Sequence, residues 1–205
     1  MKYLNLCDKY RAWLEEKGDT PEGVGWTQPN QAPIRYKVML EVIKKYPTSI
    51  LDFGCGTAAL LDYIKILGVR DIVYYGIDIL PESISIATKK HPEAKIVCAD
   101  IIRNDELLQG CPAEYAIING LFTYKYNSSF EEMWEFLQVI MGKLFHHASK
   151  GLAINLMSKA VDWERDDLFH MPVGTITDFI TKNLTRHYVI RHDYKLYEYT
   201  IYLYK

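Results

Sequence analysis

The stretch ILDFGCGTAALLDYI, residues 50–64, constrains the fold more than any other part of the sequence. Apolar residues suited to a buried strand run into Gly54-Cys55-Gly56, and a helix-like segment follows at once. A loop with so few side chains lets a ligand approach the backbone closely. The stretch therefore predicts a strand, a loop and a helix with a ligand site at the loop.

The rest of the middle of the chain alternates between strand-like and helix-like segments. The expected strands are 49–53, 71–77, 95–99, 115–119 and 152–156. The expected helices are 58–67, 81–90, a short one near Asp105, and a long one opened by a capping box from Ser128 to Glu131. Because strands separated by helices pair in parallel through right-handed crossovers, this order predicts an α/β fold with a doubly wound sheet and helices on both faces.

The two ends of the chain depart from this alternation. The N-terminus predicts an amphipathic helix ending near Gly18, an ordered loop or lid over 18–33, and a helix over 34–46. After the charged segment 158–172 and a helix over 175–183, two strand-like runs, 187–191 and 198–204, lie too close together for a crossover helix. These runs predict an antiparallel hairpin, whose alternating tyrosines we expect to pack in the core.

Composition narrows the classes of function. A length of 205 residues with 49% hydrophobic residues fits one substantial core, hence a single domain. A net charge of -2 and a pI near 6.3 provide no basic excess, so nucleic acid is not an expected partner. The sequence lacks an apolar run of roughly 18 residues and a signal peptide, which predicts a cytoplasmic protein away from membranes. Four scattered cysteines indicate reduced thiols in a core.

The glycine loop alone permits more than one cofactor. Gly54, Gly56 and Ala59 satisfy the pattern of a dinucleotide site. Asp52, however, would repel a pyrophosphate and attract an ammonium group. This favours S-adenosylmethionine, which carries an ammonium and a cationic sulfur.

Two more acids end the next two strands. Asp78 stands at the distance from the glycines at which a carboxylate bonds ribose hydroxyls, and Asp100 can accept from an adenine amino group while Ile79 or Ile101 packs on the ring. Three acids at the ends of successive strands indicate one ligand that lies along the sheet edge.

The segments ILDFGCGTAALL, YGIDI, CADI and AIINGLF resemble the successive motifs of class I S-adenosylmethionine-dependent methyltransferases, over residues 49–122. The resemblance implies a Rossmann-like, seven-stranded, mostly parallel sheet with an antiparallel C-terminal strand. Residues 48–205 would form this core, and residues 1–47 the N-terminal helices and lid. More narrowly, GWTQPNQAPIRY, NGLFTYK and RHDYKLYEYTIYLYK resemble a bacterial subgroup associated with capsule and surface-polysaccharide pathways.

The same resemblance implies roles for individual residues. The residues expected to contact the methionine portion of the cofactor are Asp52, Gly54, Cys55 and Gly56. Asp78 would bind the ribose, and Asp100 with Ile79 and Ile101 the adenine. Asn119 and Gly120 would lie beside the methyl group. Ala58 and Ala59 stand where many relatives have a third glycine, and we expect the site to tolerate them. Trp26, Gln31 and Arg35 would form a lid in which the guanidinium pairs with the cofactor carboxylate.

Methyl transfer to an alcohol requires a general base. The candidate catalytic residues are His192 with Asp193 as its orienting partner, His170, and Tyr124. His192 equally fits a structural network that braces the hairpin, and His170 a surface role. No histidine pair has the i, i+4 spacing of a helical metal site, so no metal is predicted.

The sequence therefore predicts S-adenosylmethionine-dependent O-methylation of a small molecule, with S-adenosylhomocysteine as product. The leading acceptor is a sugar or nucleotide-sugar precursor of a surface polysaccharide. The alternatives are an NAD(P)-dependent oxidoreductase, a catalytically silent S-adenosylmethionine-binding partner protein, and a protein or RNA methyltransferase. Neither the acceptor nor the oligomeric state follows from the sequence.

Overall fold

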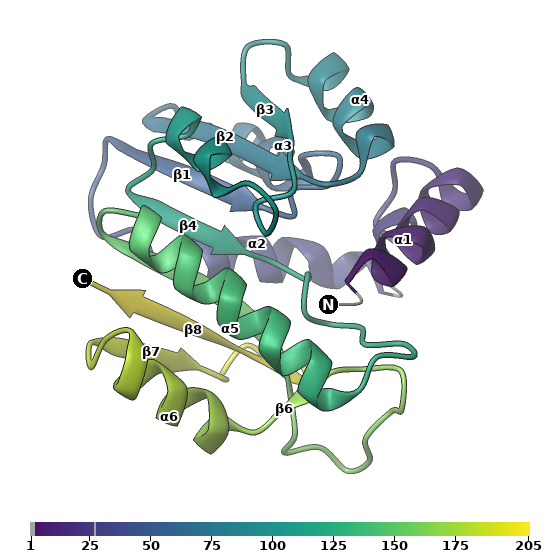
Figure 1. Cartoon of the computed structure of the whole chain (residues 1–205). Helices are drawn as coiled ribbons and strands as arrows, with labels where there is room; N and C mark the ends of the chain where they lie inside the picture. Colours follow the sequence, from purple (N-terminus) through teal and green to yellow (C-terminus); the bar gives the residue numbers. More distant parts are fainter. Residues whose placement is uncertain (1–2, 27) are drawn as a thin grey trace.

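A computed structural model describes residues 3–26 and 28–205 and shows a twisted sheet with helices packed on it (Figure 1). The sheet has eight strands among the described residues, and seven of them follow the order β3-β2-β1-β4-β5-β8-β7. The strands are β1 Thr48–Phe53, β2 Ile72–Asp78, β3 Lys95–Cys98, β4 Tyr115–Ile118, β5 Gly151–Ser158, β6 His170–Met171, β7 Tyr188–Arg191 and β8 Glu198–Tyr204.

The strand pairing confirms the mostly parallel sheet with an antiparallel end. Strands β1 to β5 pair in parallel, whereas β8 runs antiparallel between β5 and β7. The hairpin predicted from the short connection is therefore present. The two-residue strand β6, which pairs in parallel with the end of β5, has no counterpart in the sequence-based expectation.

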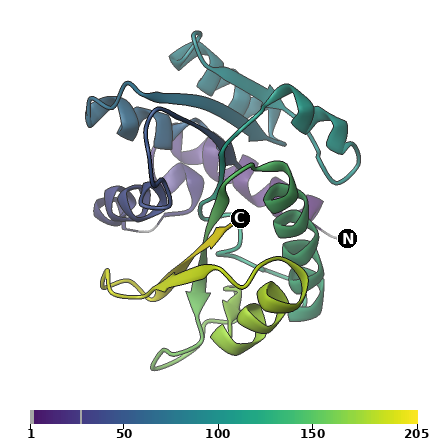
Figure 2. The same ribbon diagram turned by 90° about the vertical axis from the view of Figure 1, so that its left-hand side faces the viewer.

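Helices cover both faces of the sheet (Figure 2). The α-helices are α1 Leu4–Lys17, α2 Ala32–Leu40, α3 Ala59–Ile66, α4 Pro81–Lys90, α5 Phe130–His147 and α6 Val173–Asn183, and the short 3-10 helices are η1 Glu22–Val24, η2 Pro29–Gln31 and η3 Asp105–Gly110. Side chains alternate across each strand, so Leu51 and Ile118 join the core under α5 and α6, while Ile50 and Ile117 join the core under α2 and α3. The strands are therefore buried on both faces.

Two predicted boundaries were wrong. The helix expected over 34–46 is α2, which begins at Ala32, with Pro33 in its first turn, and ends at Leu40 because the chain turns there toward β1. The capping box lies one residue later than expected: Ser129 Oγ accepts from the Glu132 N–H at 3.2 Å, and the Glu132 carboxylate accepts from the Ser129 N–H at 3.0 Å.

The four cysteines differ in burial. Cys55 and Cys111 are buried free thiols, as expected, and Cys7 is half-buried. Cys98 is exposed, contrary to the expectation, because it lies on the edge strand β3. No helix among the described residues is long and apolar enough to cross a membrane.

Helix α1 lies at the carboxyl ends of the parallel strands (Figure 1). Three polar contacts hold the N-terminal segment there: Tyr3 Oη donates to Asp100 at 2.6 Å, Arg11 Nε pairs with Glu82 at 2.9 Å, and Lys90 Nζ pairs with Asp19 at 2.9 Å. Because α/β sheets bind ligands at this edge, the helix covers the expected position of a site.

Candidate active site

The first cavity opens at the carboxyl ends of β1 to β4, beside the glycine loop. Gly54 and Gly56 have φ angles of +74° and +54°, a left-handed conformation that other residues rarely adopt. A Cβ at either position would meet only side-chain atoms at 3.6 Å or more. The loop therefore requires glycine for its backbone conformation rather than for space, and its backbone borders the cavity. The φ of Ala58, +64°, shows that the chain also accommodates a methyl group in this conformation.

Asp52 is a buried acid in the wall of this cavity. Tyr74 Oη donates to its carboxylate at 2.7 Å. Burial raises the pKa of Asp52 to about 7, the Tyr74 hydrogen bond lowers it, and the nearby Asp78 carboxylate raises it. An ammonium group bound here would favour the ionised carboxylate, so the position suits a cationic ligand.

Asp78 is fixed by the backbone around it. One carboxylate oxygen accepts from the Gly56 N–H at 2.8 Å, and the other accepts from the Leu80 N–H at 2.8 Å. Burial raises the pKa of Asp78, and these backbone hydrogen bonds oppose that rise. The carboxylate is thus oriented in advance on the cavity wall, where its remaining lone pairs can accept from hydroxyl groups.

Asp100 joins the third strand to helix α1. Its Oδ2 accepts from Tyr3, and its Oδ1 accepts from the Ile102 N–H at 3.0 Å. Ile79 and Ile101 line the same part of the cavity, as expected for an apolar ring site. The sequence-based prediction missed Tyr3 as a partner of this acid.

Asn119 and Gly120 follow β4 and also line the first cavity. Asn119 Oδ1 is a buried oxygen without a hydrogen-bond partner among the described residues. Because buried polar atoms are nearly always paired in native proteins, this oxygen points to a ligand that supplies the donor. Together with the acids and the glycine loop, it fits a cofactor that carries an ammonium and several hydroxyl groups.

Helix α1 and η1 complete the first cavity from above. Tyr3, Leu6, Tyr10, Leu14 and Val24 line it, although the sequence-based prediction named none of them as a site residue and placed only Val24 in the expected loop or lid over 18–33. The apolar stripe of the first helix could have indicated these cavity-lining residues. Without knowledge of the strand ends beneath it, however, such a stripe indicates ordinary core packing.

A second cavity adjoins the first. It is lined by the loop 161–168, the turn 195–197 and parts of the N-terminal segment. Tyr10, Val24, Trp26 and Gly120 line both cavities. A ligand in either one therefore approaches the other across Gly120 and the Trp26 ring.

The predicted lid residues take different places. Trp26 borders both cavities, as a lid residue would, but Gln31 and Arg35 line only the second. Arg35 Nε donates to both carboxylate oxygens of Glu198, at 2.8 and 2.9 Å, and Arg35 Nη2 donates to Gln31 Oε1 at 3.3 Å. The expected pairing of Arg35 with a cofactor carboxylate is therefore replaced by an internal ion pair.

Two predicted catalytic residues line the second cavity. Tyr124 Oη donates to the Gly25 carbonyl at 2.9 Å, and burial raises the pKa of Tyr124. His170 is buried, not on the surface, with Nδ1 2.6 Å from the Ser158 carbonyl and Nε2 accepting from the Arg165 N–H at 3.2 Å. The carbonyl can only accept, so Nδ1 donates to it, and with Nε2 accepting from Arg165 the ring braces the loop 158–170.

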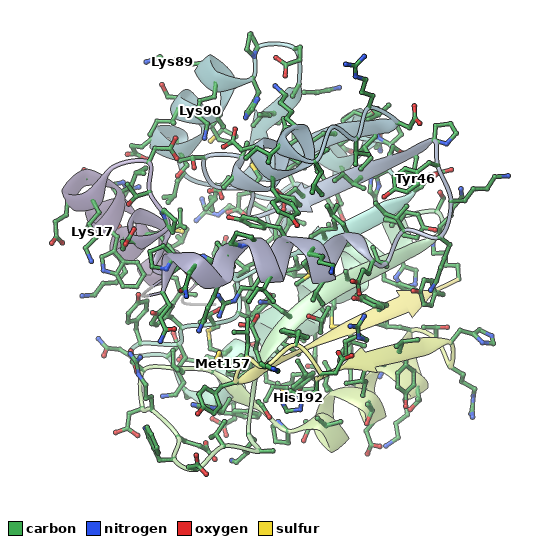
Figure 3. The ribbon with its side chains drawn as sticks, turned by 180° about the vertical axis from the view of Figure 1, so that it is seen from behind. Lys17, Tyr46, Lys89, Lys90, Met157 and His192 are labelled. Atoms are coloured by element: carbon green, nitrogen blue, oxygen red, sulfur yellow. The ribbon has the colours of Figure 1, made fainter. Side chains whose placement is uncertain are left out.

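The other two predicted catalytic residues lie outside both cavity linings. His192 is exposed beyond β7, against the Tyr199 ring at 6.1 Å, and Figure 3 shows it far from Lys17 at the end of α1. The Asp193 carboxylate accepts from Arg191 Nε at 2.7 Å and Arg191 Nη2 at 3.1 Å. The expectation that Asp193 orients His192 is therefore wrong, because an adjacent guanidinium occupies both carboxylate oxygens.

Glu198 is the acid that the sequence-based prediction missed. It begins β8, is only 3% exposed and lines the second cavity. The available signal was a charged residue opening an otherwise apolar strand, EYTIYLY. Within residues 3–26 and 28–205, no group of three or more His, Cys, Asp or Glu side chains is placed to hold a metal ion.

Comparisons with known proteins agree with this geometry. Residues 51–107, which contain the glycine loop and the next two strand ends, match a family described as a methyltransferase domain. A Mycobacterium tuberculosis protein named as a methyltransferase, Rv1506c, is 29% identical over 160 residues, which is 76% of this chain and 92% of the relative.

Two solved structures share the fold. An S-adenosylmethionine-dependent methyltransferase from Aquifex aeolicus has a TM-score of 0.57 and 18% identity, over 86% of this chain and 93% of that one. The plantazolicin methyltransferase BpumL, solved with a desmethyl plantazolicin analogue and S-adenosylhomocysteine, has a TM-score of 0.65 and 17% identity, over 100% of this chain and 98% of that one.

Proposed function

We propose that this S-adenosylmethionine-dependent methyltransferase transfers the methyl group to a hydroxyl of a small molecule bound in the second cavity. The observation that carries this proposal is the border shared by the two cavities at Trp26 and Gly120. S-adenosylmethionine supplies an electrophilic methyl group on a cationic sulfur. Holding an acceptor in line with that group across the border is the main task left to the protein.

The first cavity provides the cofactor contacts in this proposal. Asp52 holds the ammonium group beside Gly54, Cys55 and Gly56, Asp78 accepts from the ribose hydroxyls, and Asp100 with Ile79 and Ile101 receives the adenine. Residues 1–47 act as the lid, with α1 above the cofactor, and residues 48–205 form the core of a single domain.

The proposed acceptor is a sugar or nucleotide-sugar precursor of a surface polysaccharide. Two aromatic side chains of the second cavity are largely exposed. Trp163 is 73% exposed and Tyr197 67% exposed, which corrects the expectation that Tyr197 packs in the core. Exposed rings beside a polar cavity offer apolar faces for the C–H faces of a sugar ring. Arg35, Glu198 and Tyr124 deeper in the cavity offer partners for its hydroxyl groups.

In this proposal His170 is the general base that removes the proton of the acceptor hydroxyl. Tyr124 forms a hydrogen bond with the acceptor. Because Nδ1 of His170 donates to the Ser158 carbonyl, the lone pair of the ring lies on Nε2, and the acceptor hydroxyl must displace the Arg165 N–H that donates to it at 3.2 Å. We expect His170→Gln to lower kcat at least about tenfold while leaving S-adenosylhomocysteine binding unchanged. A His170→Gln enzyme with wild-type kcat at every pH would exclude this role.

A titration followed by an acceptor screen tests the function as a whole. Calorimetry should show binding of S-adenosylmethionine and S-adenosylhomocysteine but not of NADH. Release of S-adenosylhomocysteine is then measured with free sugars and with nucleotide sugars. Turnover with a sugar hydroxyl supports the proposal, turnover only with amine, peptide or RNA acceptors replaces its acceptor class, and binding without turnover of any acceptor favours a silent partner protein.

Trp163 provides a separate test of the acceptor site. We expect Trp163→Ala to raise the KM for the best sugar acceptor about tenfold with little change in kcat, since loss of stacking removes about 1–1.5 kcal/mol of binding. Trp163→Tyr should retain most of the affinity. The matched control is Trp134→Phe, because Trp134 on α5 packs against Phe179 of α6 and lines neither cavity. An unchanged KM in Trp163→Ala would contradict the aromatic platform.

A further inference from the structure

A buried chain of hydrogen bonds leads from the first cavity to the second. The Gly120 N–H donates to Asn155 Oδ1 at 2.8 Å, and Asn155 Nδ2 donates to Glu198 Oε1 at 3.2 Å. Glu198 then receives the Arg35 guanidinium through both carboxylate oxygens. Asn155 and Glu198 are nearly inaccessible to solvent, so these contacts compete little with water.

Arg35, the last residue in this series of hydrogen bonds, also contacts Gly120 indirectly, through the ring of Trp26. The guanidinium carbon of Arg35 lies 4.2 Å from the centroid of the Trp26 ring, within the range of a cation–π contact. The Trp26 ring in turn packs so closely on Gly120 that a Cβ there would lie 3.3 Å from the ring. Glu198 therefore supports Gly120 through Asn155. Through Arg35 it also supports Trp26, whose ring covers Gly120.

We infer that Glu198 is a positioning residue for the cofactor site, although it lines only the acceptor cavity. By holding Arg35 it holds the Trp26 ring on Gly120, at the border where the two cavities meet. The inference rests on the proposed function, since it takes the first cavity as the S-adenosylmethionine site.

The physical basis is the difference between a paired and an unpaired buried charge. The Arg35 side chain is 15% exposed and the Glu198 side chain 3% exposed, so a neutral residue at 198 leaves the guanidinium poorly solvated and without its counter-ion. The guanidinium then moves toward water and loses its stacking on Trp26. The Trp26 ring has no other charged partner among the contacts of the described residues.

The arrangement has a consequence for the acceptor. A hydroxyl or charged group that binds Glu198 or Arg35 also changes how firmly Trp26 covers the cofactor. By thermodynamic linkage the bound cofactor then changes acceptor affinity by the same factor. The ion pair thus couples the two binding sites.

The test is the affinity of Glu198→Gln for S-adenosylhomocysteine, measured by calorimetry well below the Tm of the variant. We expect a loss of about tenfold, within the range of about 5–150-fold typical of coupled sites. The matched control is Glu41→Gln, which breaks the ion pair of Glu41 with Arg191. That pair also joins the end of α2 to the C-terminal hairpin but borders neither cavity. Glu41→Gln should bind with wild-type affinity.

A double-mutant cycle separates positioning from general loosening of the fold. In a Trp26→Leu background, Glu198→Gln should change the affinity by less than about twofold, because the ring is gone and the glutamine Oε1 can still accept from Asn155 Nδ2, which leaves the other support of Gly120 in place. Independent effects of the two substitutions, or an equal loss in Glu41→Gln, would overturn the inference. If the wild type binds S-adenosylhomocysteine and Glu198→Gln binds it with the same affinity, the inference is wrong but the proposed function still stands. Failure of the wild type to bind either adenosyl ligand overturns the proposed function as well.

Discussion

Replacing Asp78 by alanine is expected to reduce the affinity for S-adenosylmethionine and S-adenosylhomocysteine by at least about 100-fold. In the proposed role the carboxylate accepts from two ribose hydroxyls, and hydrogen bonds to a charged group contribute about 1.5–3 kcal/mol each. The substitution also leaves the N–H groups of Gly56 and Leu80 without their acceptor, which loosens the glycine loop. Calorimetric titration of the two ligands measures the effect.

The matched control for Asp78→Ala is Asp71→Ala, at the opposite end of the same strand. Asp71 is exposed and precedes β2, so its removal changes the net charge equally without touching the cavity. Asp71→Ala should bind like the wild type. If Asp78→Ala retains affinity within about fivefold, the ribose is not held at this strand end and the orientation proposed for the cofactor is wrong.

Asp52→Asn is expected to stabilise the ligand-free protein at neutral pH while weakening cofactor binding at least about tenfold. The buried carboxyl has a pKa of about 7 in the folded state and the ordinary value of 3.8 when exposed. A raised folded-state pKa means that the folded chain keeps a proton that the unfolded chain loses. Stability therefore falls as the pH rises from about 4 to about 7, and asparagine removes this loss.

Cofactor affinity should follow the opposite trend. The ammonium group requires the ionised carboxylate, so wild-type affinity rises with pH up to about 7 and then levels off. The groups around Asp52 are Tyr74 and Asp78 on β2, Cys55 in the loop and Tyr36 on α2, and of these only Asp78 is another carboxylate. In Asp52→Asn the affinity should be lower and its pH dependence smaller.

Two measurements check the Asp52 prediction. Thermal unfolding of the ligand-free proteins should give Asp52→Asn a Tm a few degrees above the wild type near pH 7.5, and nearly the same Tm near pH 4, since 1 kcal/mol shifts Tm by about 2–4 °C at this size. Calorimetry between about pH 5 and 7.5 follows the affinity. A variant that is less stable than the wild type at both pH values, or that binds as tightly, contradicts the role of Asp52 as the ammonium partner.

Most secondary structure could be predicted because its signals are local. Strands with apolar residues on both faces, the glycine turn and the short final connection are each contained in a few residues, and all appear in the fold. One error, the position of the capping box, came where two competing local signals lie one residue apart. Ser128 and Ser129 both precede acids at the capping-box spacing, and only the turn from Lys125 to Ser128 decides which one caps α5.

The first cavity was more predictable than the second. Parallel strands bring their carboxyl ends to one edge, so topology places Asp52, Asp78, Asp100 and Asn119 together whatever their side chains contact. The second cavity is built from loops and from partners distant in the chain. Arg35 and Glu198 are 163 residues apart, and no local pattern announces their pairing.

The sequence by itself determined the alternation of strands and helices, the edge at which the first cavity opens, and the acids that line it, because periodicity and strand order depend on neighbours along the chain. Only the tertiary structure decided which side chains are available for chemistry. It paired Arg35 with Glu198, Asp193 with Arg191, and His170 with Ser158. A charge or a lone pair acts according to its partner in space, and that partner is chosen by packing.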